Sequence, residues 1–297
     1  MTARPNFLFI GADKCGSSWL HKVLSEHPQC FIPPAKDIYF FDRFYEKGLD
    51  WYLRFFADAP GQARCVGEVC HDYLYSAQAA QRIARDLPDV KLVAFLREPA
   101  DRTFSHYLYM IRSGRTRVSF REALESYPEL VEHSSYAKHL APYFELFPEG
   151  QLKVFFYDDL RAAPREFARS IFEFLGLEWT DSLDYEGKVR PASAPRSFLL
   201  AKALKQGAAL ARNLGWANFV GRIKNSSFAF RLYKPYKAAA KPAATDEERK
   251  YLLAALDADL HQLVRVLPQP LPAWIPAGDD AARVQARPDL RSEVAGN

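Results

Sequence analysis

Short apolar runs alternate with amphipathic segments along the first 180 residues of the chain. Each run is four to six residues long, and the segments between the runs carry apolar positions at helical spacing. Near-continuous apolar runs are typical of strands buried in a parallel sheet that is covered on both faces. The predicted strands are 7–10, 30–33, 65–69, 91–96 and 152–157.

The segments between these runs are predicted to be helices, and several carry recognisable end signals. Ser76 is a suitable N-cap, Pro99 suits a first helical turn, and Gly176 closes a helix. Strands that alternate with helices indicate an α/β fold with a central parallel sheet flanked by helices. The predicted helices are 17–27, 50–57, 76–87, one that begins at Pro99, 119–127, 136–147 and 162–175.

The pattern loosens after Trp179. We expect a loop over 185–197, a basic helical stretch over 197–214, irregular chain to 243, and a helix that the capping box Thr245–Glu248 opens and that ends near Leu267. The prediction is a single domain over 1–267, helical in its C-terminal third from about 197, followed by a proline-rich, mobile tail over 268–297.

Composition narrows the class of partner only slightly. The formal net charge of +4 is too small to indicate nucleic-acid binding, yet it is compatible with an anionic ligand. No run approaches the roughly 20 apolar residues of a membrane span, and we expect no signal peptide. The four cysteines fit no zinc pattern and are predicted to be reduced thiols, so we expect a cytoplasmic protein without a metal.

The residues between the first strand and the first helix form a candidate anion-binding loop. This loop contains Gly11, Lys14, Gly16, Ser17 and Ser18. Its glycines allow the backbone to approach an anion closely, N–H groups at the start of the helix point at the anion, and the lysine adds a positive charge. A Walker A loop has Gly-Lys-Ser/Thr together, whereas this lysine precedes the second glycine by two residues.

A second anion site is predicted at the end of the central strand 91–96. Arg97 ends that strand, and Ser105 lies on the helix that follows, so the two side chains could hold a second phosphate together. Ligands of parallel sheets bind at the carboxyl ends of the strands. Lys14, Glu68 and Arg97 are therefore expected to converge there.

These two sites together resemble the PAPS-dependent sulfotransferases. Lys-Cys-Gly-Ser-Ser-Trp-Leu (14–20) is similar to the family's 5′-phosphosulfate loop, and Leu-Arg-Glu-Pro-Ala-Asp-Arg-Thr-Phe-Ser-His-Tyr (96–107) is similar to its 3′-phosphate element. The resemblance covers residues 5–180 and points to the bacterial and Golgi-like branch, with motifs like those of the heparan sulfate enzymes. It implies the P-loop-like sulfotransferase fold, PAPS as the sulfuryl donor and PAP as the product.

The resemblance also implies roles for individual residues. Lys14 would stabilise charge on the leaving group, and Arg97 with Ser105 would hold the 3′-phosphate. Lys36-Asp-Ile-Tyr-Phe-Phe-Asp (36–42) resembles the family's Lys-Glu-Pro-His-Phe-Phe segment and is expected to line the acceptor site. The remaining donor-binding candidates are Cys15, Gly16, Ser17, Ser18, Trp19, Tyr136 and Arg196, and the acceptor-binding candidates are Lys36, Tyr39 and Phe40.

Three residues are candidates for the general base that the acceptor needs. Glu68 leads because it matches the family's catalytic glutamate strand, although the heparan sulfate enzymes follow that glutamate with lysine and here Val69 stands. His71 and His106 are the alternatives.

The predicted function is transfer of a sulfuryl group from PAPS to a hydroxyl, less favourably an amine, of a glycan, glycolipid or secondary metabolite. A P-loop-type kinase and a non-catalytic nucleotide-binding protein of the same fold are the alternatives. The sequence leaves the acceptor and the oligomeric state open.

Overall fold

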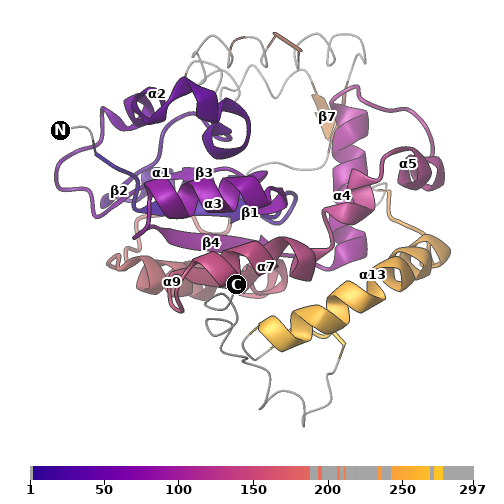
Figure 1. Cartoon of the computed structure of the whole chain (residues 1–297). Helices are drawn as coiled ribbons and strands as arrows, with labels where there is room; N and C mark the ends of the chain where they lie inside the picture. Colours follow the sequence, from indigo (N-terminus) through magenta and orange to yellow (C-terminus); the bar gives the residue numbers. More distant parts are fainter. Residues whose placement is uncertain are drawn as a thin grey trace, which may run out of the picture.

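The chain folds around a five-stranded parallel sheet, seen at the centre of the computed structural model in Figure 1. The structure describes residues 3–187, 242–267 and 271–276, with 193–195, 206–207, 211, 218 and 233–235 between them. The strand order is β2-β3-β1-β4-β5, so the chain moves first to one side of β1 and then to the other. The strands are β1 (Phe7–Gly11), β2 (Cys30–Phe31), β3 (Cys65–Val69), β4 (Lys91–Leu96) and β5 (Leu152–Phe156).

The helices confirm most of the sequence-based prediction. Ser76 caps its helix by accepting a hydrogen bond from the backbone N–H of Ala79, as expected from its position. The structure adds two short helices that the periodicity did not reveal, α6 (Glu129–Glu132) and α8 (Tyr157–Ala162). The others are α1 (Ser17–Glu26), α2 (Leu49–Leu53), α3 (Ala77–Asp86), α4 (Pro99–Arg112), α5 (Phe120–Ser126), α7 (Tyr136–Leu146), α9 (Pro164–Leu175) and α13 (Asp246–Val266).

The aromatic segment after β2 is more helical than predicted. The candidate acceptor segment 36–42 runs into a π-helical turn, η1 (Phe40–Phe44), which is followed by a 3-10 turn, η2 (Tyr45–Lys47). The expected helix 50–57 is divided into α2 and a 3-10 turn, η3 (Arg54–Phe56). Aromatic rings packed against one another over this stretch hold these tight turns in place.

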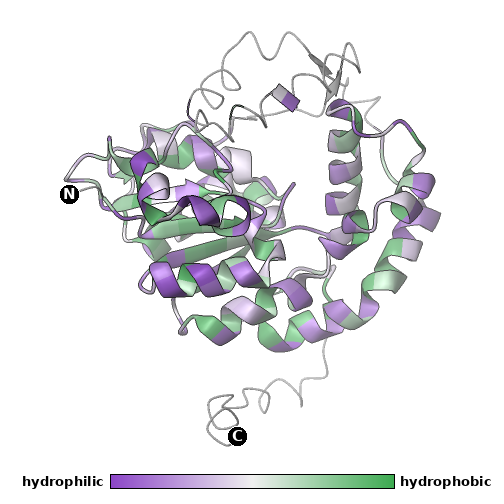
Figure 2. Cartoon of the chain, turned by 45° about the horizontal axis from the view of Figure 1, so that its top comes forward, coloured by the Kyte–Doolittle hydropathy of each residue, from purple (hydrophilic) through white to green (hydrophobic). Residues whose placement is uncertain are grey.

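The core lies between the sheet and the helices that cover it. All five residues of β1 are buried, and Phe95 of β4 packs edge-on against Phe9 and Phe167. Trp19 of α1 contacts Phe167 of α9 with ring centroids 5.6 Å apart, and α3 packs against α7. Figure 2 shows the strands coloured as hydrophobic at the centre of the molecule, with polar positions on the helices around them.

The helix α13 completes the domain from a distant part of the sequence. It packs along α7 and α4, as Figure 1 shows, and its Arg249 forms ion pairs with Glu98 and Asp101 at the start of α4. The capping box predicted at Thr245 and Glu248 is present.

Residues 271–276, which lie within the predicted mobile tail 268–297, pack against the domain. Trp274 donates a hydrogen bond from its indole Nε1 to Asp158 over 3.1 Å, and Ile275 is buried. The apolar Trp and Ile side chains explain the docking, because they remove area from water that a purely polar tail would leave exposed. The basic stretch predicted over 197–214 and most of 215–243 lie outside the described residues. Within the described part of the chain, no helix is long and apolar enough to cross a membrane.

Candidate active site

The anion loop predicted at residues 11–18 joins β1 to α1 and is tied to the neighbouring strand. The N–H of Ala12 donates to the carbonyl of Phe95 in β4 over 2.9 Å. Gly16 caps α1 with φ of 106°, a left-handed conformation that favours glycine. The N–H groups of Ser17 and Ser18 begin the helix, where no intrahelical carbonyl is in reach, so they are available to an anion. The loop thus has the geometry that the sequence predicts.

Two of the predicted donor-binding residues in this loop point elsewhere. The indole of Trp19 donates to the carbonyl of Tyr185 over 2.8 Å, and the Trp19 N–H bonds to the Gly16 carbonyl at 2.9 Å. Burial raises the pKa of the Cys15 thiol to about 12, and its Sγ lies 3.3 Å from the carbonyl of Asp13. Both side chains therefore serve the packing of the loop.

Arg97 reaches the loop from the end of β4. One guanidinium nitrogen lies 3.4 Å from the Lys14 carbonyl and another 3.3 Å from Asp101, while the group stacks over the ring of Tyr157. Its side chain keeps 14% of its surface exposed. Ser105 is partly exposed on the following helix α4. Arg97 and Lys14 converge as predicted.

Tyr136 was predicted as a donor-binding residue, but its side chain is fully buried. Its hydroxyl donates to the backbone carbonyl of Arg97 over 2.7 Å. Tyr136 thus supports the strand end that carries Arg97, because the ring fills the core behind it. The last donor-binding candidate, Arg196, lies outside the described residues.

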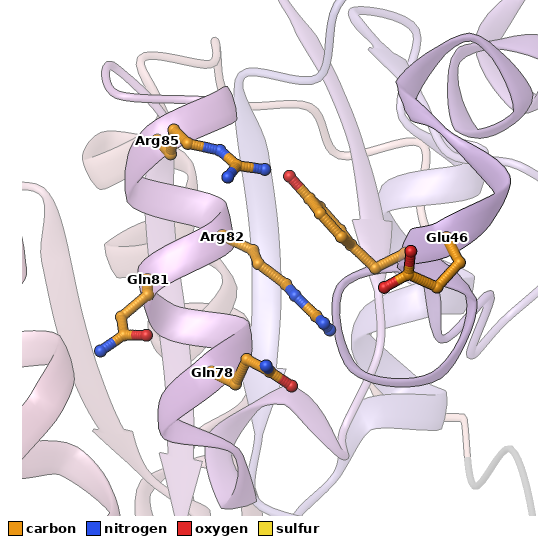
Figure 3. A pocket seen from close by; sticks show the side chains of 6 residues that line it. Glu46, Gln78, Gln81, Arg82 and Arg85 are labelled. Atoms are coloured by element: carbon orange, nitrogen blue, oxygen red, sulfur yellow. The ribbon is translucent and has the colours of Figure 1, made fainter.

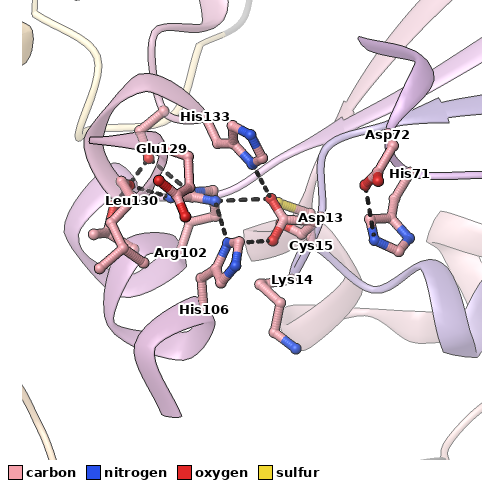
Figure 4. A network of polar contacts seen from close by, with 12 residues as sticks. Asp13, Lys14, Cys15, His71, Asp72, Arg102, His106, Glu129, Leu130 and His133 are labelled. Atoms are coloured by element: carbon pink, nitrogen blue, oxygen red, sulfur yellow. Dashed lines mark hydrogen bonds and ion pairs between the residues drawn. The ribbon is translucent and has the colours of Figure 1, made fainter. Parts of the chain in front are cut away.

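Asp13, the residue before Lys14, is the centre of a buried polar network shown in Figure 4. Its carboxylate accepts from Arg102 at 2.7 Å and from Tyr75 at 2.6 Å, and it lies 2.8 Å from Nδ1 of His106. Although burial alone would raise the pKa of Asp13, His106 and Arg102 hold it well below its ordinary value. Asp13 is therefore a carboxylate anchored to α4. The sequence patterns did not single it out.

Arg102 joins this network to the rest of the helical layer. The guanidinium is fully buried and donates to Ser134 at 2.7 Å, to Thr103 at 3.2 Å and to the carbonyl of Leu130. These partners lie on α4 and on the α6–α7 segment. The anion loop is thus attached through Asp13 and Arg102 to elements more than 80 residues away.

The same network bears on His106 and on metal binding. Asp13, His106 and His133 place one ligand atom each within 4.8 Å of one another, a grouping that could hold a metal ion. The Asp13 carboxylate is already paired with the Arg102 guanidinium, however. The positive charge of Arg102 would repel a metal ion bound at this carboxylate. Burial lowers the pKa of His106 despite the pull of Asp13. His106 is therefore part of the network that anchors Asp13.

A second polar cluster lies at the carboxyl end of β3, beside the anion loop. The ammonium of Lys36 donates to the hydroxyl of Ser17 over 2.7 Å. The next residue, Asp37, has one carboxylate oxygen 2.6 Å from Nδ1 of His71, and Asp72 lies 3.1 Å from Nε2 of the same ring. Lys36 therefore brings the segment that contains Asp37 onto the anion loop.

The two carboxylates control the charge of His71. Burial alone would lower the pKa of His71, but Asp37 and Asp72 raise it above its ordinary value. The His71 side chain is 24% exposed and that of Asp37 is 14% exposed, so solvent can reach the pair. Asp37 was not among the sequence candidates. The sequence signal that could have pointed to Asp37 is its position directly after Lys36, which was a candidate.

Glu68, the leading sequence candidate for the base, lies inside the protein. Its carboxylate is fully buried and accepts from the N–H of Ile38 at 2.8 Å and from the hydroxyls of Tyr52 and Tyr73, each at 2.9 Å. The carboxylate is thus held inside the protein by the segment that follows β2 and by the turn that follows β3.

Burial raises the pKa of Glu68 to about 8, against the three donors that favour its ionised form. A carboxyl whose pKa is higher in the folded than in the unfolded protein stabilises the fold at pH values below the unfolded pKa. That stabilisation is lost as the pH rises through the folded pKa. We therefore expect the melting temperature to fall between about pH 5 and pH 8, and Glu68→Gln to flatten that decline. Melting curves across this range test it, with the exposed Glu125→Gln as control; an unchanged slope in Glu68→Gln would contradict it.

The acceptor-binding candidates divide between the surface and the core. Tyr39 is partly exposed, and the guanidinium of Arg43 lies 4.0 Å from the centre of its ring. Phe40 is fully buried and stacks on Tyr52 at 4.6 Å, so its ring is part of the core. Lys36 and Tyr39 stay candidates for the acceptor site.

A pocket of about 360 Å³ lies on the outer side of α3 and is shown in Figure 3. It contains none of the predicted site residues. The guanidinium of Arg82 stacks over the ring of Tyr45 at 4.3 Å and donates to the carbonyl of Phe41. Because these polar groups already satisfy one another, we assign the pocket no part in the chemistry.

Comparison with known proteins identifies the family. A family model described as a sulfotransferase domain matches residues 4–205. The chain is 28% identical over 293 residues to human bifunctional heparan sulfate N-deacetylase/N-sulfotransferase 2, covering 91% of this chain and 31% of that protein. It is 29% identical over 183 residues to mouse heparan sulfate glucosamine 3-O-sulfotransferase 3A1, covering 59% and 46%. The chain thus spans less than half the length of these curated relatives.

A solved structure agrees with this match. The crystal structure of a sulfotransferase from Alicyclobacillus acidocaldarius superimposes with a TM-score of 0.58 at 29% identity, covering 77% of this chain and 99% of that one. The predicted fold class is confirmed, since the central parallel sheet flanked by helices is that of a sulfotransferase. The chain belongs to the sulfotransferase family, as the motifs at residues 14–20 and 96–107 indicated.

Proposed function

We propose that this chain transfers a sulfuryl group from PAPS to a hydroxyl group of a glycan or small-molecule acceptor, with an amine as the alternative acceptor group. The observation that carries the proposal is the convergence of two cationic sites at one sheet edge. Arg97 lies 3.4 Å from the carbonyl of Lys14, whose loop opens α1. A nucleotide with phosphates at its 3′ and 5′ positions needs two such sites, one for each group.

The donor would bind with its 5′-phosphosulfate at the start of α1. The N–H groups of Ser17 and Ser18 would point at the anion, and Lys14 would add a full positive charge. The ammonium of Lys14 lies 4.3 Å from the ring centre of Tyr109, an exposed residue of α4. Arg97 and Ser105 would hold the 3′-phosphate.

In the transfer step the acceptor oxygen forms a bond to sulfur while the bond from sulfur to the 5′-phosphate oxygen breaks. Negative charge grows on that leaving oxygen, where Lys14 stabilises it. The acceptor's proton passes to a carboxylate oxygen of Asp37, which we propose as the general base in place of Glu68, with His71 as the residue that positions it. This assignment is supported by partial exposure of the pair and by the Lys36–Ser17 hydrogen bond that places it beside the loop.

A kinase of the P-loop type is the other enzyme class that the loop suggests. It would need a carboxylate near the loop to hold Mg²⁺. Asp13 is the carboxylate of the loop itself, and its oxygens face Arg102, Tyr75 and His106. This arrangement favours sulfuryl transfer. A cytoplasmic location also stays a proposal, supported by four cysteines that are all free thiols.

Calorimetry with adenosine 3′,5′-bisphosphate tests the donor site, and transfer of radiolabelled sulfate from PAPS to acceptor pools tests the reaction. We expect micromolar binding of the bisphosphate without added magnesium. Binding of ATP in its place, or no binding at all, would overturn the proposal.

Arg97→Ala is expected to weaken bisphosphate binding by about 10- to 100-fold, because a hydrogen bond to a charged group contributes roughly 1.5–3 kcal/mol. The matched control is Arg121→Ala on the exposed face of α5, where the guanidinium pairs with Glu125 and stacks on Tyr251. Equal affinities for the two variants would show that Arg97 does not hold the phosphate.

A further inference from the structure

Cys30 and Cys65 stand directly opposite each other on neighbouring strands. Cys30 begins the edge strand β2, Cys65 begins β3, and the two residues are partners in the parallel register. Neighbouring strands lie about 4.8 Å apart, and partnered residues project to the same face of a sheet. That spacing falls within the range of Cα separations that a disulfide spans, about 4.4–6.8 Å.

The strand register places the two cysteines side by side, and His27 lies in the turn before β2. The neighbouring Cys65 thiol and the His27 ring lower the pKa of Cys30, while the Cys30 thiol and burial raise the pKa of Cys65. Cys30 is partly exposed, whereas Cys65 is 2% exposed. A nucleophilic, accessible thiol thus stands beside a buried partner that can attack it in turn.

The other two cysteines provide an internal contrast. Cys15 and Cys70 are both fully buried, and burial raises the pKa of each thiol. Neither has the exposure or the thiolate character that reaction with an oxidant requires. Reactivity is therefore expected at one pair of cysteines.

We propose that Cys30 and Cys65 form a redox-active dithiol that a low-molecular-weight disulfide, such as glutathione disulfide, converts reversibly into an intramolecular disulfide. The Cys30 thiolate attacks one sulfur of glutathione disulfide and releases one glutathione thiolate. The Cys65 thiol then loses its proton and attacks the Cys30 sulfur of the mixed disulfide, which releases the second glutathione. Two protein thiols are oxidised, and one glutathione disulfide is reduced to two thiols.

The position of the pair gives the disulfide a structural consequence. β2 leads into the segment that contains Lys36 and Asp37, and β3 leads to His71. A bond between the starts of these strands would close a loop of about 35 residues that contains the whole aromatic segment. Closing a loop of this length restricts the unfolded chain, so the melting temperature is expected to rise by about 5–10 °C.

The test is incubation of the purified, reduced chain with glutathione disulfide, followed by thiol titration in denaturant and peptide mass spectrometry. We expect two of the four thiols to disappear, a peptide joining Cys30 to Cys65, recovery of all four thiols with dithiothreitol, and the higher melting temperature in the oxidised sample. Four remaining thiols, or a glutathione adduct on Cys30 that does not resolve, would overturn the proposal.

Three variants sharpen the result. Cys65→Ser should stop the reaction at a glutathione adduct on Cys30, and Cys30→Ser should leave all its thiols unreacted. Cys70→Ser is the matched control, because Cys70 lies at the other end of β3 and its loss should leave the disulfide unaffected. A disulfide that needs Cys70 or Cys15 would contradict the assignment. The readouts do not depend on turnover, so this test is independent of the proposed sulfuryl transfer.

Discussion

Asp37→Asn is expected to lower kcat by about 10²- to 10⁴-fold, the usual contribution of a general base. The asparagine keeps the size of the side chain and can still accept from His71 through its amide oxygen. It removes the negative charge that lies 2.6 Å from the ring. Affinity for adenosine 3′,5′-bisphosphate should stay within about twofold of that of the unsubstituted chain, because Asp37 makes no part of the proposed donor site.

The comparison that decides the assignment is Glu68→Gln. Glu68 is buried among Ile38, Tyr52 and Tyr73. The glutamine variant should therefore keep most of the activity of the unsubstituted chain at pH 5 to 6, because the Glu68 carboxyl is itself neutral at that pH. Asp89→Asn, in the exposed turn before β4, serves as the carboxylate control. Sulfate transfer from labelled PAPS gives kcat for all three. A loss in Glu68→Gln as large as that in Asp37→Asn would return the role of base to Glu68.

The sheet could be predicted almost entirely from the sequence, for a physical reason. Strands covered on both faces are apolar at nearly every position, so runs such as 91–96 stand out without reference to the rest of the chain. The helices α6 and α8 escaped prediction because four and six residues are too few for a periodic pattern. Residues 271–276 escaped it because prolines around them suggested a tail, whereas Trp274 and Ile275 dock on the core.

The anion loop was also predictable, because its residue types follow directly from the chemistry of phosphate binding. The base was not. The position of Glu68 in its strand predicts that it lies near the carboxyl end of the sheet. It does not predict that Tyr52 and Tyr73 donate hydrogen bonds from their hydroxyls to its carboxylate. Phe40 and Tyr39 are neighbours in one aromatic run, and only packing decides that Phe40 enters the core. The spacing of residues along the sequence does not show which distant segments contact each other in the fold.

Arg102→Met is expected to destabilise the protein by about 3–5 kcal/mol, because it leaves the buried carboxylate of Asp13 without its main counter-charge. For a chain of this size the melting temperature should fall by roughly 10 °C. Arg121→Met, at an exposed ion pair, is the control and should shift it by no more than about 1–2 °C. A similar shift in both variants would contradict the buried role of Arg102.

The double variant Asp13→Asn with Arg102→Met separates stability from catalysis. Because it removes both charges, it should recover a substantial part of the lost stability, as replacement of a whole buried ion pair often does. It should not recover turnover. Asp13 precedes Lys14, and without the Asp13–Arg102 contact at 2.7 Å the loop is no longer fixed to α4, so the ammonium is less well placed against the leaving oxygen. A double variant that regains both stability and full kcat would show that the network supports the fold alone.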